Sequence, residues 1–115
     1  MHVPKTKEEL RSLIEADVPG DQIDVRYIND MSGLFKNTTY NHPLDSWDVS
    51  RVESMIRMFA MSQYNHMLES WDVCRVDSME YMFYGSEYNH PIDSWVFSEF
   101  VSTYCMFTDH DIFNY

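Results

Sequence analysis

Basic residues are scarce in this chain, and none follows Arg75. The 115 residues include 8 Lys and Arg against 19 Asp and Glu, a formal net charge of −11. Nucleic acids and anionic membrane surfaces are bound through basic patches. The charge therefore argues against either as a direct partner and favours a protein partner with a basic surface.

Glycine, cysteine and long apolar runs are also scarce. Three glycines leave Asn, Ser, Asp and Pro to turn most corners of the chain. For Cys74 and Cys105 we expect no disulfide framework. No segment has the character of a secretion signal or a membrane span. We therefore expect a cytoplasmic protein, including the case of a protein acting in the cytoplasm of an infected bacterial host.

The sequence does contain a 24-residue repeat. The residues that recur at this interval are Trp47, Trp71 and Trp95, the Tyr-Asn-His triplets at 40–42, 64–66 and 88–90, and Phe35, Phe59, Phe83 and Phe107. Such repeats are typical of solenoids, in which each unit is one coil stacked on the next. We number units 1 to 4 from their starts at residues 23, 47, 71 and 95. A column is the set of residues at the same place in successive units, spaced by about 4.8 Å.

Local patterns predict the elements. Thr6 and Glu9 have capping-box spacing, and apolar residues at helical intervals predict a helix over about 7–16 that covers the first unit. Each unit is predicted to have a short strand near 44–48 and a helical turn near 55–60. The chain divides into a capping segment, 1–22, and a repeat, 23–115, within one domain. The predicted core is Leu44, Trp47, Val49, Val52, Met55, Met58, Phe59 and their counterparts.

The phrase Trp-Asp-Val-Ser-x-Val-x-x-Met-x-x-Met-Phe, which begins at Trp47, resembles the BspA-like class of leucine-rich repeats. The opening Pro-Lys-Thr-Lys-Glu-Glu-Leu segment is also similar, and the resemblance covers about residues 4–107. It implies an α/β repeat, a short leucine-rich-repeat-like solenoid of about four coils with a small parallel sheet and an N-terminal capping helix. It also implies adhesion or protein binding.

Acidic side chains fall into three columns. These are Asp45, Glu69 and Asp93; Asp24, Asp48 and Asp72; and Glu53 and Asp77. Some can be structural, since an Asp after Trp can accept hydrogen bonds from its own turn, and Arg51 or Arg75 can pair with it. The absence of balancing cations after Arg75 favours a role in binding. The candidate partner-binding residues are Asp45, Asp48, Glu53, Glu69, Asp72, Asp77, Glu80, Glu87, Asp93 and Glu99.

His42, His66 and His90 form another column, for which two interpretations are open. Three imidazoles about 5 Å apart can share a metal ion with the nearby carboxylates. Alternatively, the histidines are neutral and each bonds a nearby carboxylate or backbone group. The asparagine before each histidine is expected to point inward and bond the backbone of the adjacent coil.

Aromatic residues gather where the repeat stops. Phe97, Phe100, Tyr104, Phe113 and Tyr115 are the candidate set. Either a final half-coil at 113–115 folds over these rings, or two chains meet there end to end, so a monomer and an end-to-end homodimer both remain open.

No nucleophile with a base, no phosphate loop and no metalloprotease motif occurs, so we expect a non-enzymatic protein without a cofactor. The main hypothesis is an acidic nucleic-acid mimic that inhibits a nucleic-acid-binding defence protein, in the manner of phage or mobile-element anti-CRISPR or anti-restriction proteins. One alternative is a generic protein-binding or adhesive repeat. A second is metal binding, or metal-dependent catalysis, through the histidine column.

Overall fold

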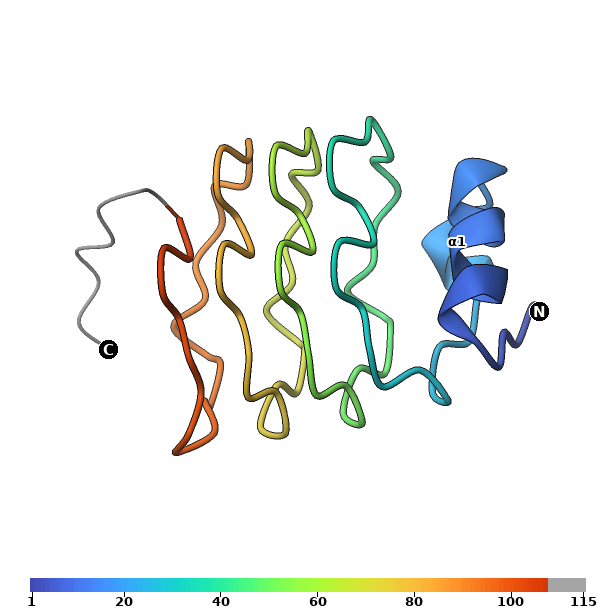
Figure 1. The fold of residues 1–115 in the computed structure, drawn as a ribbon. Coiled ribbons are helices and arrows are strands. Elements are labelled where there is room, and N and C mark those ends of the chain that lie inside the picture. Colours follow the sequence, from blue (N-terminus) through green and yellow to red (C-terminus); the bar gives the residue numbers. More distant parts are fainter. Residues whose placement is uncertain (108–115) are drawn as a thin grey trace.

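The computed structural model describes residues 1–107. In this range the chain forms an α-helix, α1 (Lys7–Glu15), and a short 3-10 helix, η1 (Gly20–Gln22). Successive turns of chain then lie side by side in sequence order, one for each repeat unit, and α1 lies across the first of them (Figure 1).

The helix α1 forms where the sequence predicts it. The Thr6 hydroxyl accepts a hydrogen bond from the Glu9 N–H at 3.2 Å, and the Glu9 carboxylate accepts from the Lys5 N–H at 2.9 Å. These bonds satisfy backbone donors at the helix start. Leu10 and Ile14 are buried on one face, so the helix is held by packing on unit 1.

The predicted fold class, an α/β leucine-rich-repeat-like solenoid with a parallel sheet, is wrong. Residues 1–107 contain no strand, and neighbouring units meet through isolated parallel bridges that link Asp30, Ser54, Ser78 and Ser102 in order. Residues 44–48 are not a strand, and 56–60 form turns in place of the helical turn predicted near 55–60.

Alternating hydrogen bonds explain why no sheet forms. The Arg57 N–H donates to the Glu80 carbonyl of the next unit at 3.0 Å. The following Met58 N–H donates back to Met55 in its own unit at 3.2 Å. A strand requires consecutive extended residues, whereas here the chain turns on itself between successive inter-unit bonds.

Those turns use left-handed backbone conformations. Gly33, Arg57, Tyr81 and Cys105, which form one column, have φ of 65°, 54°, 58° and 50°. Such angles cost roughly 1–2 kcal/mol for a residue with a side chain. In the first three units the residue at this position donates its N–H to the following unit at 2.8–3.1 Å, which offsets part of that cost. The expectation that Asn, Ser, Asp and Pro make the corners is therefore incomplete, because Arg, Tyr, Met and Cys also make them.

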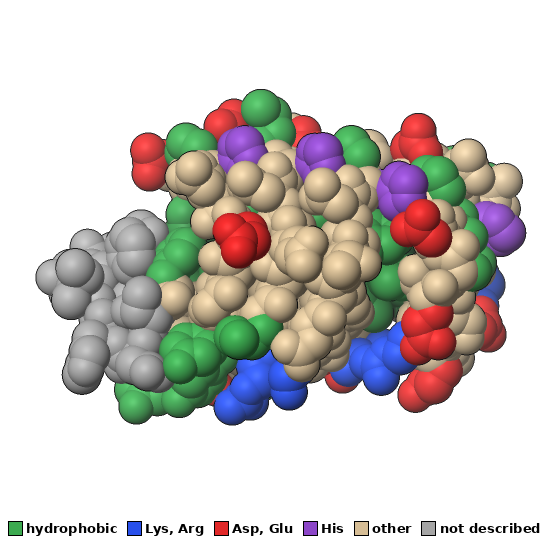
Figure 2. Space-filling model, turned by 90° about the horizontal axis from the view of Figure 1, so that it is seen from above, with side chains coloured by type: hydrophobic (Ala, Val, Ile, Leu, Met, Phe, Trp, Pro, Cys, Tyr) green, Lys and Arg blue, Asp and Glu red, His purple; other side chains and the backbone are tan. Residues whose placement is uncertain are grey.

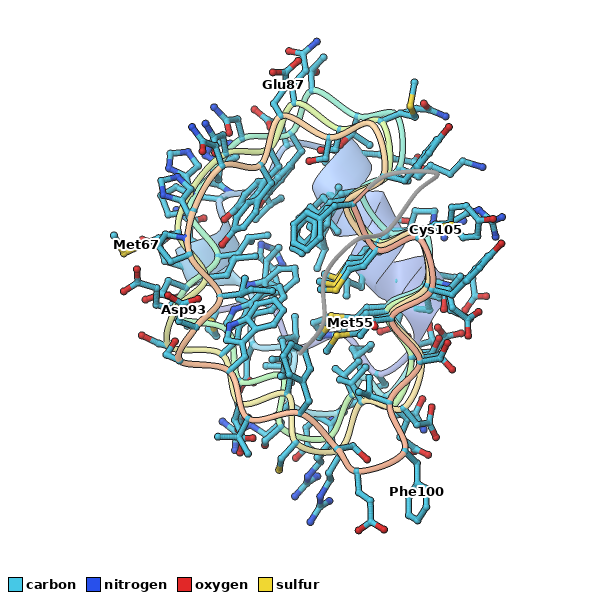
Figure 3. The ribbon with its side chains drawn as sticks, turned by 90° about the vertical axis from the view of Figure 1, so that its left-hand side faces the viewer. Met55, Met67, Glu87, Asp93, Phe100 and Cys105 are labelled. Atoms are coloured by element: carbon cyan, nitrogen blue, oxygen red, sulfur yellow. The ribbon has the colours of Figure 1, made fainter. Side chains whose placement is uncertain are left out.

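The predicted core is confirmed through units 2 and 3. Leu44 and the six other predicted positions are at most 4% exposed, and their counterparts 24 residues later are equally buried. The phenyl rings of Phe35, Phe59 and Phe83 stack almost parallel at 5.2 and 5.6 Å between centroids. Figure 3 looks along this stack and shows Met55 pointing into the interior.

Tryptophan ties each unit to the segment before it. Each buried indole N–H donates to a backbone carbonyl at 2.9 Å, in the pairs Trp47 with Gly20, Trp71 with Leu44, and Trp95 with Leu68. The donors and acceptors are therefore satisfied in the core, as buried polar groups require.

Unit 4 departs from the register. Its turn closes from Val101 to Ser98, one residue later than the turns that close from Val52 to Val49 and from Val76 to Val73. This shift turns Phe100 outward, so that it is 80% exposed, whereas the equivalent valines are buried. The core prediction is therefore wrong for Phe100.

Two tyrosines in one column differ in their hydrogen bonding and yield a stability test. The buried Tyr64 hydroxyl accepts from the Leu44 N–H at 3.0 Å, whereas the buried Tyr88 hydroxyl has only a weak contact with the Leu68 backbone and makes no full hydrogen bond among residues 1–107. Tyr64→Phe leaves a buried N–H unsatisfied and is expected to lower the free energy of unfolding by about 1–3 kcal/mol. Tyr88→Phe is expected to stay within about 0.5 kcal/mol of the parent. Urea denaturation measures both, and equal losses would contradict the difference in bonding.

Alkaline pH gives a second test. Burial raises the pKa of Tyr88 to about 12, and it raises the pKa values of Tyr40 and Tyr64 further. A raised pKa contributes stability that is complete below the unfolded value of about 10 and is lost as the pH rises through the folded value. The free energy of unfolding should therefore fall between about pH 10 and pH 12. Tyr88→Phe should fall less steeply in urea titrations at stepped pH, and an unchanged slope would refute the assignment.

Candidate functional site

The candidate acidic residues lie on the surface, but on more than one side of the stack. Asp45 and Glu80 are half-buried and the others are exposed. Figure 3 shows Glu87 and Asp93 pointing outward in different directions. The structure therefore brings the carboxylates together within columns and separates the columns from one another.

In the first acidic column, one carboxylate is hydrogen-bonded within the protein and two are available to a partner. Asp45 accepts hydrogen bonds from the Ser70 N–H at 3.0 Å and the Ser70 hydroxyl at 2.8 Å, which joins unit 1 to unit 2. Glu69 and Asp93 are exposed, and neither carboxylate makes a hydrogen bond or ion pair within residues 1–107. They are the members of this column that are free to meet a partner.

The carboxylates of the second acidic column accept hydrogen bonds that stabilise turns of the chain. The Ser50 N–H donates to Asp48 at 3.0 Å and the Ser50 hydroxyl at 2.6 Å, and the Cys74 N–H donates to Asp72 at 3.1 Å. Asp24 accepts from the Arg26 N–H at 3.1 Å and from its guanidinium Nε at 2.8 Å.

These bonds stabilise the charged carboxylates. Hydrogen bonds from Ser50 lower the pKa of Asp48, those from Cys74 lower the pKa of Asp72, and those from Arg26 lower the pKa of Asp24. Nearby arginines contribute a weaker effect in the same direction. This column therefore combines a structural role with negative charge that cations partly balance.

The remaining candidate carboxylates make weak hydrogen bonds or none within the described chain. Asp77 is 3.4 Å from the Ser78 hydroxyl, a long contact. For the part of the chain that the structure describes, no hydrogen bond or ion pair involves the side chains of Glu53, Glu80, Glu87 or Glu99. They are available for intermolecular contacts.

The histidine column shows the bonding expected of the second interpretation. The His66 and His90 Nε2 atoms lie 2.5 and 2.9 Å from the backbone oxygens of Asn41 and Asn65 in the preceding unit. The His42 Nε2 atom lies 3.1 Å from the Asp17 carboxylate. Over residues 1–107, no three His, Cys, Asp or Glu side chains converge as a metal site would require.

The asparagine column bridges neighbouring units but does not point inward as predicted. The Asn41 side-chain oxygen accepts from the Asn65 N–H at 3.3 Å, and the Asn65 oxygen accepts from the Asn89 N–H at 3.0 Å. All three residues are exposed. A short amide spans adjacent backbones at the surface, where water satisfies its other groups.

The aromatic candidates of unit 4 separate into buried and exposed members. Phe97 is half-buried and packs edge-on against Trp95, with ring centroids 6.2 Å apart. Phe100 and Tyr104 are 80% and 66% exposed, and Val96 in the same unit is 73% exposed. Phe113 and Tyr115 lie outside the described residues, as does the predicted half-coil.

Sequence reasoning missed a cleft between α1 and unit 1. It has a volume of about 680 Å³ and is lined by Arg11, Ile14, Glu15, Asp17, Gly33, Leu34, Lys36, Asn37, Thr38, Thr39 and Tyr40. The sequence offered one signal for this cleft. Gly33 has no side chain, whereas Arg57, Tyr81 and Cys105 in the same column do.

Comparison with known proteins identifies a family but no function. A family model described as "Mycoplasma protein of unknown function, DUF285" matches residues 6–115. Neither the curated proteins nor the solved structures yielded a match. Across the described range, 1–107, no helix combines the length and apolar character needed to cross a membrane.

Asp48 permits a test that separates its bonds from its charge. Asp48→Ala removes the acceptor of the Ser50 bonds and should lower the free energy of unfolding by about 0.5–1.5 kcal/mol. Asp48→Asn keeps a side-chain oxygen at that place and should lose less. Chemical denaturation at neutral pH measures both, and equal losses would show that the charge, rather than the turn, is what stabilises the fold.

Proposed function

We propose that this chain, which belongs to the DUF285 family of Mycoplasma proteins of unknown function, is a non-enzymatic protein-binding module for a basic partner surface. The observation that carries the proposal is a set of exposed carboxylates repeated at the step of the unit, in a chain with a net charge of −11. Such a surface attracts cationic partners and repels anionic ones.

The residues best supported as partner contacts are those whose carboxylates do not stabilise the fold through hydrogen bonds. Glu69 and Asp93 stand one unit apart and are exposed. Asp48 and Asp72 are bound to their own turns and lie close to arginines, so their contribution to a partner is smaller. The first acidic column is therefore the proposed centre of recognition.

The specific form of this proposal is an acidic mimic of nucleic acid. Carboxylates repeated at about 4.8 Å are somewhat closer together than phosphates along a strand, but of a similar spacing. A defence protein that binds nucleic acid presents a basic groove, and these columns would occupy it. The proposed role is accordingly inhibition of the anti-CRISPR or anti-restriction kind.

A second candidate function rests on the exposed apolar surface of unit 4. Val96, Phe100 and Tyr104 are each more than 60% exposed, and aromatic residues are enriched at protein interfaces. This surface favours a generic protein-binding or adhesive repeat. The repeat phrase supports membership of the BspA-like repeat class, for which such binding is expected.

Charge reversal at matched positions tests the main proposal. Tagged protein is used to capture partners from bacterial lysate at about 0.05 M and about 0.5 M salt. Glu69→Lys with Asp93→Lys should abolish a capture that is already weak at the higher salt concentration.

The control is Glu8→Lys with Glu15→Lys, two exposed residues of α1, which changes the net charge equally but lies outside the acidic columns. It should retain the captured partner. Loss in both double variants would indicate a nonspecific charge effect. Capture that survives high salt and is lost only in Phe100→Ala would favour the second candidate.

A further inference from the structure

The cleft between α1 and unit 1 is a recess with polar and apolar parts. Its volume of about 680 Å³ falls within the range of small-molecule sites. Figure 2 shows the hollow between the helix and the stack, with cationic side chains toward one end and acidic ones along the α1 side. Ile14 and Leu34 are buried residues that contribute to its lining.

Gly33 lines this cleft, and its backbone conformation does not explain why it is glycine. A Cβ atom built at Gly33 meets nothing within 4 Å. Arg57, Tyr81 and Cys105 adopt nearly the same positive φ in later units and carry side chains. The left-handed conformation alone therefore does not demand glycine here, and what distinguishes Gly33 is the space that it leaves.

The charged groups of the cleft carry both signs. Arg11 and Lys36 are exposed, and neither side chain forms an ion pair or hydrogen bond in the described chain. Glu15 likewise has no partner there, while Asp17 lies 3.1 Å from the His42 imidazole. The polar side chains of Asn37 and Thr39 add hydrogen-bonding groups.

The charge of the whole chain narrows the class of ligand. A small anion would be attracted by Arg11 and Lys36 but repelled by a protein with a net charge of −11. A zwitterion has no net charge and can place its carboxylate near the two cations and its ammonium group near Glu15 and Asp17. The volume exceeds that of a single amino acid, so a longer molecule of this class fits.

We propose that this cleft binds a short zwitterionic peptide with a free amino terminus and a free carboxyl terminus. Ile14 and Leu34, which are 6% and 3% exposed, form the floor beneath it, and the charged groups recognise its two termini. This site is separate from the acidic columns proposed to bind a protein partner, because none of the candidate acidic residues lines the cleft.

The test uses the full chain, labelled for NMR, and the tripeptide Ala-Ala-Ala as probe. The free tripeptide should shift the amide resonances of Gly33, Lys36 and Thr39 at millimolar concentration. The amidated and the N-acetylated tripeptides each lack one charge and should bind at least about tenfold more weakly, the equivalent of about 1.4 kcal/mol.

Variants of the lining complete the design. Gly33→Tyr introduces the residue that unit 3 carries in this column, so the backbone tolerates it, and it should abolish the shifts by filling the cleft. Lys36→Gln and Arg11→Gln, which change exposed side chains, should weaken binding without altering the melting temperature. Arg51→Gln, an exposed residue outside the cleft, is the control and should bind as the parent does.

The proposal is overturned by any of three results. The first is no shift with the free tripeptide. The second is equal binding of the capped tripeptides, which would show that the termini are not recognised. The third is unchanged binding by Gly33→Tyr, provided that its circular dichroism matches the parent.

Discussion

The rest of the structure depends on the register of backbone hydrogen bonds between successive units. Alternate N–H groups of one unit donate to carbonyls of the next, as Arg57 does to Glu80 and Phe59 does to Met82. Because this pattern recurs from unit to unit, residues 24 apart occupy equivalent surroundings. The stacked phenyl rings, the indole bonds and the surface columns all follow from this register.

The repeat period predicted the core and the existence of columns, but not the secondary structure. Apolar residues at fixed places in each unit have only one interior to occupy, so the burial of Leu44 and Met55 could be read from sequence. The absence of a sheet could not, because it depends on left-handed corners at Arg57 and Tyr81, residue types that rarely mark such corners. The outward turn of Phe100 was also hidden, since its spacing from Val52 and Val76 is regular and only the displaced turn moves it.

From the sequence, the acidic residues could be recognised as candidates for a binding site, but the role of each one could not be assigned. Sequence reasoning named both Asp48 and Glu69 as acidic column members, but the geometry separates a carboxylate that holds its own turn from one that makes no bond to the described chain. Position in the unit explains the bonds of Asp48 but not the lack of bonds at Glu69, because Asp45, at the same place as Glu69, accepts hydrogen bonds from Ser70. An Asp directly after Trp lies two residues before an N–H that it can reach, whereas Glu69 lies before Trp71, and it is the Ser94 hydroxyl that bonds its backbone oxygen. Charge alone therefore overstates the number of residues available for binding.

One column shows how a repeated scaffold acquires different local chemistry. The backbone at Gly33, Arg57 and Tyr81 is nearly the same, so the side chain alone determines what the surface offers there. In units 2 and 3 the Arg57 guanidinium lies 4.6 Å from the centre of the Tyr81 ring, and Tyr81 meets Tyr104 edge-on at 5.8 Å between ring centroids, which closes that part of the surface. In unit 1 the same place holds no side chain and borders the open cleft beside α1. Because the inter-unit hydrogen bonds made at this column use only the backbone, substitutions there can change the surface without changing the stack, which allows binding sites to differ along one chain.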